Sequence, residues 1–227
     1  MANQNGNPQG SKALLLAAAK AVMEESGYAS VTSRRIAAKA GLKPQLVHYY
    51  FDTMDALLLE LFRGLATEIV DLQEAAVESE TPLRKLWDLL SDRKKRILLE
   101  QFLIISCFNR SIQEEMGKLG KVFRDKQIKF LQRLLQENGI SEFPWSAEFI
   151  SILFNALARA LAIEPSYGLD LGSEKAMEVI NYYIDKFDRK IPDPATTILR
   201  LERENAELKA RVAALTGQLD AACGTAV

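Results

Sequence analysis

Apolar residues recur at helical spacing along most of the chain, and no alternating apolar and polar stretch is long enough to predict a β-strand. Three helical stretches come first, and they predict helices at Ser11–Ser26, Thr32–Ala40 and Pro44–Phe51. Gly27 and Gly41 follow the first two of these stretches, where a glycine commonly ends a helix. The pattern therefore predicts an all-α protein that begins with a small three-helix head.

A tight turn is expected between the second and third predicted helices. The Thr32 hydroxyl can cap the second helix, and Gly41, which lacks a Cβ, permits the left-handed turn that ends it. Pro44 suits the first turn of the third helix, because its missing N–H would have no partner there anyway. Two short helices joined through a glycine turn are typical of a helix-turn-helix motif. On the third helix, Val47 and Phe51 are expected to face inward.

Longer helices are predicted from Thr53 onward. Thr53 can cap a helix that runs to about Glu78 and joins the head to the rest of the chain. Later helices are expected to start at Thr81 and Pro82, to follow a cap at Ser91 or Asp92, and to occupy Ser111–Asn138, Ser146–Glu164 and Ser173–Lys190. The predicted organisation is a flexible tail at 1–10, a helix-turn-helix domain at 11–53 and a helical bundle at 54–191.

A heptad pattern distinguishes the segment 196–221. Pro192 and Pro194 should break the preceding helix, and apolar residues then recur at alternating spacings of three and four. The positions of this seam are Ile198, Leu201, Asn205, Leu208, Val212, Leu215 and Leu219. One interpretation is a short parallel coiled coil between two subunits, and the other is an amphipathic helix packed on its own bundle.

The head carries a local excess of positive charge, although the whole chain has a formal net charge of -1. The stretch from Ser30 to Phe51 contains no Asp or Glu, and its basic residues are Arg34, Arg35, Lys39 and Lys43. Such a basic patch indicates a module that contacts phosphate groups.

The outward residues of the third predicted helix are suited to reading DNA. They are Gln45, Leu46, His48 and Tyr49. A Gln amide can pair with adenine, a Leu can contact a thymine methyl, and His and Tyr can donate to phosphate oxygens. The alternative is that these residues only pack against a neighbouring helix.

The run VTSRRIAAKAGLKPQLVHYYFDTMDALL resembles the head motif of the tetracycline-repressor (TetR) family. The matching positions are Thr32, Arg34, Ile36, Ala37, Ala40, Gly41, Tyr50, Phe51 and Leu57. The resemblance extends in detail only to about Leu61. It implies an all-helical homodimer whose heads read a palindromic operator on double-stranded DNA and whose larger domains bind a small-molecule effector.

Carried over to this chain, the resemblance implies that Thr32, Ser33 and Arg34 hold phosphates and that Gln45, Leu46 and Tyr49 face bases, while His48 contacts the backbone. Lys43 is also predicted to bind DNA, because its positive charge suits a phosphate group.

Three positions depart from the family pattern. His48 stands where a Tyr is usual, Arg35 where an acid is common, and Met54 where a Lys is usual. Because the Lys is lost, we expect Arg35 or Lys43 to supply the missing phosphate contact.

Ligand contacts are predicted for aromatic and polar residues of the bundle, although ordinary core packing is the alternative for each aromatic. The candidates are Trp87, Glu100, Gln101, Phe102, Phe108 and Phe123. Glu100 and Gln101 interrupt an apolar helix, and burying such groups is costly unless they find partners. Those partners could be polar atoms of a ligand, another helix of the same subunit or the second subunit. Asn155 and Arg159 lie one turn apart in another apolar helix and are assigned, with the heptad residues, to the dimer interface, because this family pairs its last two helices. The ligand would be a mainly apolar molecule with few hydrogen-bonding atoms.

Composition narrows the class of protein further. The chain has 227 residues, 48% of them hydrophobic, which is enough for a head and one larger domain. Cys107 and Cys223 are the only cysteines, which favours a reduced, cytoplasmic protein without a disulfide framework. The polar N-terminus is expected to be no signal peptide, and no apolar run approaches the ~18 to 20 residues of a membrane span.

An enzyme is not expected, because His48 is the only histidine and no nucleophile–base set, phosphate-binding glycine loop or metal-spaced cluster is apparent. No cofactor is expected either. The sequence therefore predicts a DNA-binding transcriptional regulator, most simply a repressor that a ligand releases from its operator. The alternative is a DNA-binding protein without a ligand, which recruits a protein partner through its bundle or coiled coil.

Overall fold

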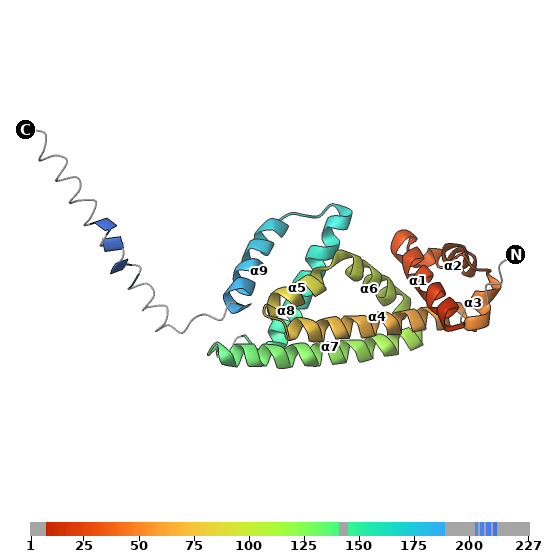
Figure 1. Ribbon diagram of the computed structural model, residues 1–227, viewed down its shortest axis with the longest axis horizontal. Coiled ribbons are helices and arrows are strands. Elements are labelled where there is room, and N and C mark those ends of the chain that lie inside the picture. Colours follow the sequence, from red (N-terminus) through yellow and green to blue (C-terminus); the bar gives the residue numbers. More distant parts are fainter. Residues whose placement is uncertain are drawn as a thin grey trace, which may run out of the picture. The chain divides into compact units, whose positions relative to one another are not determined.

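The computed structural model describes residues 8–140 and 145–188, together with Arg203, Asn205, Ala206, Leu208, Lys209, Arg211 and Val212. The chain divides into two units, Met1–Asp188 and Arg189–Val227, and the second is considered separately below. Within the described residues of the first unit, every regular element is helical, which confirms the all-α prediction (Figure 1).

The helices of the first unit follow the sequence pattern closely. They are α1 (Pro8–Ser26), α2 (Ser33–Ala40), α3 (Gln45–Tyr50), α4 (Met54–Val77), α5 (Pro82–Ser91), α6 (Arg93–Ser106), α7 (Arg110–Glu137), α8 (Ala147–Ile163) and α9 (Ser173–Asp188). Two 3₁₀ turns, η1 (Tyr28–Ser30) and η2 (Glu164–Tyr167), follow α1 and α8. The first helix begins at Pro8, so residues 8–10 extend it and do not belong to a tail. None of the helices described is long and apolar enough to cross a membrane.

Side-chain caps fix where several helices begin. Thr32 Oγ1 accepts a hydrogen bond of 3.3 Å from the backbone N–H of Arg35, and Thr53 Oγ1 accepts one of 3.0 Å from Ala56. Asp92, one of the two predicted caps, accepts a 3.1 Å hydrogen bond from the backbone N–H of Lys95. These bonds satisfy amide groups that have no partner inside the helix. They hold α2, α4 and α6 to the expected starting points.

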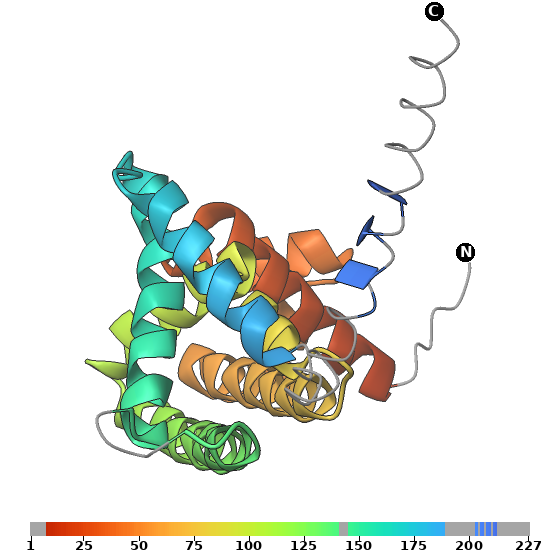
Figure 2. The same cartoon turned by 90° about the vertical axis from the view of Figure 1, so that its left-hand side faces the viewer.

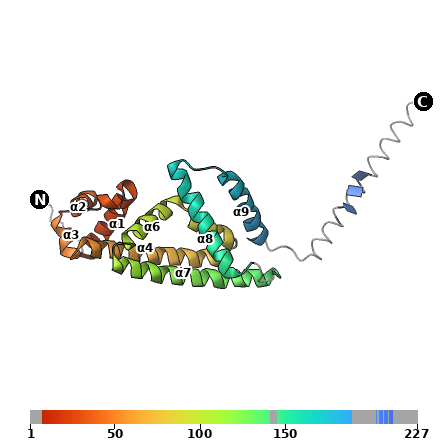
Figure 3. The ribbon, with the colours of Figure 1, turned by 180° about the vertical axis from the view of Figure 1, so that it is seen from behind.

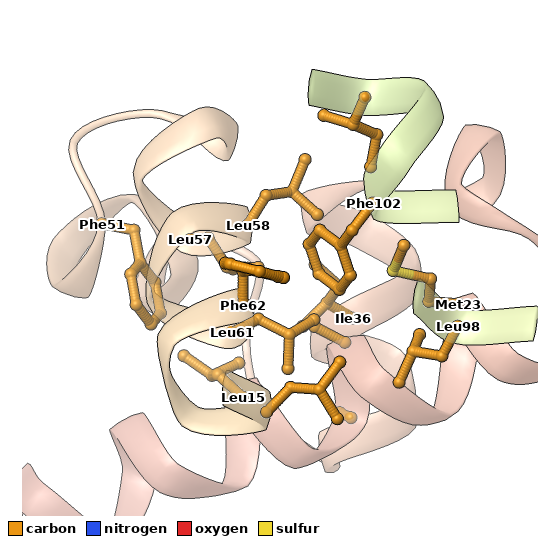
Figure 4. Packing of buried hydrophobic residues seen from close by; sticks show 14 of the residues in the cluster. Leu15, Met23, Ile36, Phe51, Leu57, Leu58, Leu61, Phe62, Leu98 and Phe102 are labelled. Atoms are coloured by element: carbon orange, nitrogen blue, oxygen red, sulfur yellow. The ribbon is translucent and has the colours of Figure 1, made fainter. Parts of the chain in front are cut away.

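The head is formed by α1, α2, α3 and the first turns of α4, and one helix of the bundle completes its core. Leu15, Ile36 and Phe62 are fully buried there. Phe102, from α6, belongs to the same hydrophobic cluster, and its ring centroid lies 5.1 Å from that of Phe62. Figure 4 shows Phe102 pointing from α6 into this cluster. The head and the bundle therefore share a core at α6.

A second hydrophobic core holds the bundle together. Trp87 of α5, Phe130 and Leu131 of α7, and Ile184 of α9 are buried in it. Helix α7 packs along α4 and also contacts α8, and α5 packs against α8 and α9. Figures 2 and 3 show these helices from the end and from behind. The carboxylate of Asp188, at the end of α9, accepts hydrogen bonds from the first backbone N–H groups of α5, which fastens α9 to the bundle.

Gly41 carries the turn between α2 and α3 and adopts φ 67° and ψ 27°, the left-handed conformation. Replacing Gly41 by Ala should lower the free energy of unfolding by about 1–2 kcal/mol, because an L side chain is strained at this φ. Denaturation by urea measures this change.

Gly64→Ala in α4 is the matched control, and it should raise the free energy of unfolding by about 0.5–1 kcal/mol, since Ala favours a helix interior. At both positions no heavy atom of the described residues lies within 4 Å of an added Cβ, apart from the adjacent residues and the backbone of the same helix, so steric clash does not separate the two variants. Equal effects of the two substitutions would contradict the backbone argument.

Candidate DNA-binding surface and effector cavity

Helix α3 presents the predicted outward face. Val47 is buried in the head core, as is Phe51 just after the helix, whereas Gln45, His48 and Tyr49 are exposed. Tyr49 keeps 76% of its surface exposed and its ring lies edge-on to that of Tyr50, 4.9 Å away. Leu46, also predicted to face outward, is only half-buried and packs partly against the head core. The side chains proposed to read bases are therefore open to an approaching groove.

The candidate phosphate contacts lie beside that face. Arg34 and Lys43 are exposed, and neither forms an ion pair with any residue that the structure describes. The Thr32 oxygen is occupied as a helix cap, but its O–H remains able to donate to a phosphate. Ser33, the first residue of α2, is half-buried. The start of α2 thus offers donors next to the recognition helix.

Other basic groups of the head are already engaged. Lys39 pairs with Glu25 at 2.5 Å, and Arg35 donates a 3.0 Å hydrogen bond to the Ser26 hydroxyl. Met54, in place of the usual Lys, is half-buried against the head core. Between the two residues expected to replace the lost phosphate contact, this arrangement favours Lys43 over Arg35.

A cavity of about 260 Å³ lies inside the bundle. Its apolar wall comes from α4, α5, α6 and α7, and consists of Ile69, Leu89, Leu90, Leu99, Leu103, Met116, Leu119 and Phe123. Its polar wall comes from α6, α7 and α8, and consists of Lys95, Arg96, Glu100, Arg124, Asn155 and Arg159. This combination of apolar walls with a few polar groups is usual in small-molecule sites.

Two of the six predicted ligand residues, Glu100 and Phe123, line this cavity. Trp87 instead lies in the bundle core, where its ring meets that of Phe154 at 5.1 Å. Phe102 is fully buried in the head core, and Phe108, after α6, is 90% exposed. The prediction grouped these aromatics together, whereas the fold distributes them among two hydrophobic cores, the surface and a cavity.

Gln101 also lies away from the cavity. Its side-chain amide donates a 3.3 Å hydrogen bond to the backbone carbonyl of Met23 in α1. Successive residues of a helix point about 100° apart, so Glu100 and its neighbour Gln101 serve different surfaces. Glu100 faces the cavity and Gln101 faces the head.

Asn155 and Arg159, assigned to the dimer interface, both find partners within the same chain. Asn155 donates to Gln127 Oε1 at 2.7 Å, and Arg159 donates to Glu100 Oε2 at 2.6 Å. Both also line the cavity. A second subunit is therefore not needed to satisfy these polar groups.

Among the charged lining residues, Lys95, Arg96 and Arg124 were given no role by the prediction. A signal for Arg96 was present, because it lies one turn before Glu100 and so on the same side of α6. Burial lowers the pKa of the Arg96 guanidinium, Glu100 acts in the opposite direction, and the Arg159 charge adds to the lowering. Arg96 is thus a charged group whose burial is energetically unfavourable.

The second unit is described only at scattered positions. Asn205, Leu208 and Val212 are helical, and Leu208 and Val212 are 60% and 61% exposed. The other heptad positions, Ile198, Leu201, Leu215 and Leu219, lie outside the described residues. The coiled coil therefore remains a prediction.

Comparison with known proteins finds a family match in the head. Residues 15–61 match the family model described as bacterial regulatory proteins, tetR family. The HTH-type transcriptional regulator BetI of Brucella anthropi is 37% identical over 73 residues, which cover 32% of this chain and 38% of BetI. The chain thus aligns with well under two thirds of that relative's length.

Solved structures share the fold over most of the chain. A TetR transcription regulator from Haloarcula marismortui has a TM-score of 0.64 at 20% identity, covering 78% of this chain and 98% of its own. A putative transcriptional regulator from Saccharomonospora viridis, in complex with choline, has a TM-score of 0.67 at 19% identity, with coverage of 81% and 97%. A SmeT–triclosan complex has a TM-score of 0.55 at 19% identity, with coverage of 72% and 83%. The matching family and BetI are described as regulators, as are the structures from Haloarcula marismortui and Saccharomonospora viridis.

Proposed function

We propose that this chain, whose residues 15–61 match the tetR family model, is a sequence-specific transcriptional regulator that a small ligand releases from DNA. The observation that carries the proposal is the exposed face of α3, with Gln45 and Tyr49 open to solvent beside the uncompensated charges of Arg34 and Lys43. A regulator needs both base-reading and phosphate-binding groups on one surface. The head supplies both.

Gln45, Leu46 and Tyr49 would read base edges in the major groove. The Gln45 amide can donate and accept at once, which matches the N6 and N7 atoms of adenine. Thr32, Ser33, Arg34, Lys43 and His48 would bind the phosphate backbone and fix the register of α3 in the groove. The expected partner is therefore an operator on double-stranded DNA.

A homodimer would present two such heads to a palindromic operator. Exposed apolar side chains lie on α8 and α9, the two helices that the family resemblance assigns to pairing. They include Phe149, Ile152 and Leu153 on α8, and Val179, Tyr182 and Tyr183 on α9. Each set follows helical spacing and so forms one stripe. Pairing of these stripes would cover apolar surface and set the two α3 helices about 34 Å apart, one turn of DNA.

Helix α6 would transmit the effect of a ligand. Arg96, Leu99 and Glu100 face the cavity, while Phe102 and Gln101 contact the head. A ligand that shifts the cavity face must also move the head face, because both belong to one short rigid helix. A ligand that binds the shifted arrangement better would change the spacing of the two α3 helices and release the operator.

The alternative is a DNA-binding protein that recruits a protein partner instead of binding a ligand. The exposed Leu208 and Val212 favour it, because both occupy heptad positions that could pair with another helix. Screening of small molecules by thermal denaturation separates the two proposals. A melting temperature that no molecule raises would favour partner recruitment.

Replacing Gln45 by Ala should weaken binding to the operator by about 5–150-fold, the 1–3 kcal/mol of one good base contact, and should leave binding to a random duplex nearly unchanged. Fluorescence anisotropy at fixed salt measures both affinities, with the intergenic DNA beside the chain's own gene as the first operator to test.

Lys43→Ala is the control for the Gln45 variant. It should weaken binding to both duplexes alike and reduce the slope of log K against log salt by about one. Equal losses of Gln45→Ala on operator and random DNA would contradict the assignment of Gln45 to base reading.

A further inference from the structure

The cavity in the bundle has an uneven charge. Among the described residues that line it, four are basic, Lys95, Arg96, Arg124 and Arg159, and Glu100 is the only acidic one. Phe123 is the only aromatic residue of this described lining. The other described lining residues are aliphatic apart from Asn155 and Gly120. A site of this kind presents positive charge together with apolar surface.

Two of the four basic groups are neutralised by carboxylates. Arg159 pairs with Glu100 at 2.6 Å, and Lys95 pairs with Asp92 at 3.3 Å. Arg96 and Arg124 form no ion pair with any residue in the described part of the chain. The cavity therefore keeps two positive charges that the bundle itself does not compensate.

Arg96 is the more demanding of these two charges. Its Nη2 donates a 2.9 Å hydrogen bond to the Leu90 carbonyl, but its Nε is buried without a hydrogen-bond partner among the described residues. Glu100 offsets part of the burial cost, but burying a guanidinium without a direct ion pair remains costly, and the arginine cannot relieve that cost by losing its proton. An anion in the cavity would satisfy this group.

We infer that the cavity binds a small amphiphilic carboxylate, with its anionic end at Arg96 and Arg124 and its apolar body against the aliphatic wall. A carboxylate can accept charge-assisted hydrogen bonds from a guanidinium, often two in parallel. The apolar body would lie along Leu99, Leu103 and Leu119. At about 260 Å³ the cavity is near the lower end of small-molecule sites, which suits a short or medium chain.

A quaternary ammonium ligand fits this site poorly. The two uncompensated arginines would repel it, and recognition of such cations usually relies on several aromatic faces, whereas Phe123 is the only one here. A neutral alcohol could occupy the apolar part but would leave both charges unsatisfied. The site therefore distinguishes ligands of equal length by the charge of their head group.

Isothermal titration calorimetry of the full chain without DNA tests this inference with three probes that share an eight-carbon chain. Octanoate should bind about 10–100-fold more tightly than octanol, because a hydrogen bond to a charged group contributes more than a neutral one. Octyltrimethylammonium should bind more weakly than either. Equal binding of octanoate and octanol, preference for the cation, or no binding of octanoate would overturn the inference.

Substitutions of the cavity arginines test where the anionic end of the ligand binds. Arg96→Met should reduce octanoate affinity by about 10–100-fold and leave octanol affinity nearly unchanged. Arg133→Met is the matched control, since Arg133 is exposed on the same α7 that carries Arg124 but does not line the cavity. If Arg96→Met does not fold, Arg124→Met provides the same comparison. Loss of octanol and octanoate binding in parallel would contradict a charge-specific site.

The inference rests on the proposed function in one respect only, namely that the bound carboxylate would act as the effector that controls DNA binding. Octanoate that binds the chain yet leaves its operator affinity unchanged would contradict ligand-controlled release and leave the carboxylate site standing. Release of the operator by a neutral or cationic molecule, with no binding of octanoate, would support the regulator and overturn the carboxylate site. The two failures are therefore separate.

Discussion

Replacing Phe102 by alanine is expected to lower the free energy of unfolding by about 3–5 kcal/mol. The Phe102 ring is fully buried, and it contacts Phe62 at the place where α6 enters the head core. Removing it would leave a cavity between two helices that the chain holds together mainly by apolar packing. Urea denaturation followed by circular dichroism measures the loss.

Phe108→Ala is the matched control for this prediction, because Phe108 follows the same helix but is 90% exposed. Its effect should stay within about 0.5 kcal/mol, as for most surface substitutions. If the two variants were equally stable, α6 would not be part of the head core in solution. The proposed path from the cavity to the head would then lose its basis.

The head could be predicted from sequence because its signals are local. The Thr32 cap and the left-handed Gly41 are each determined by residues within one turn of the chain. Val47 and Phe51 lie one helical turn apart and so share the inward face of α3. This spacing also indicates the outward face without knowledge of the fold. The structure confirms these features because little else competes with them.

The lining of the cavity could be predicted only in part, since it depends on which helices pack together. Helical periodicity separates Glu100 from Gln101, but it does not tell which side faces a cavity and which the head. Phe102 and Phe108 look alike in sequence, and only the packing of α6 against α1 and α4 buries one and exposes the other. The basic lining residues were not predicted for the same reason. Arg124 comes from α7, and only the folded bundle places it in the lining of the same cavity as Arg96.

The dimer face shows a similar limit. Asn155 and Arg159 were assigned to it because a polar group in an apolar helix needs a partner, yet Gln127 and Glu100 of the same chain provide those partners. Helix α8 instead carries a stripe of exposed apolar residues, which includes Phe149 and Ile152. A search for buried polar groups would therefore miss the apolar interface that is proposed for α8.

Placing a carboxylate at this face, through Ile152→Glu on α8, is expected to convert the proposed homodimer to monomers and to weaken operator binding by about 10²–10⁴-fold. Ile152 is 55% exposed in the single chain, and a charge buried there on pairing would have no counter-charge supplied by the apolar stripe. Each head would then bind its half-site alone and lose the advantage of simultaneous engagement. Analytical ultracentrifugation gives the subunit state, and anisotropy on the operator gives the affinity.

Val122→Glu on α7 is the matched control for the dimer prediction. Val122 is also an exposed aliphatic residue, at 44%, but it lies on neither α8 nor α9. It should leave both the subunit state and the operator affinity unchanged.

A dimer that survives Ile152→Glu with full operator affinity would place the pairing surface elsewhere, and the heptad segment that includes Leu208 and Val212 would become the next region to substitute. Monomers that still bind the palindrome at full affinity would contradict the two-headed mechanism itself, because avidity requires the two α3 helices to be joined.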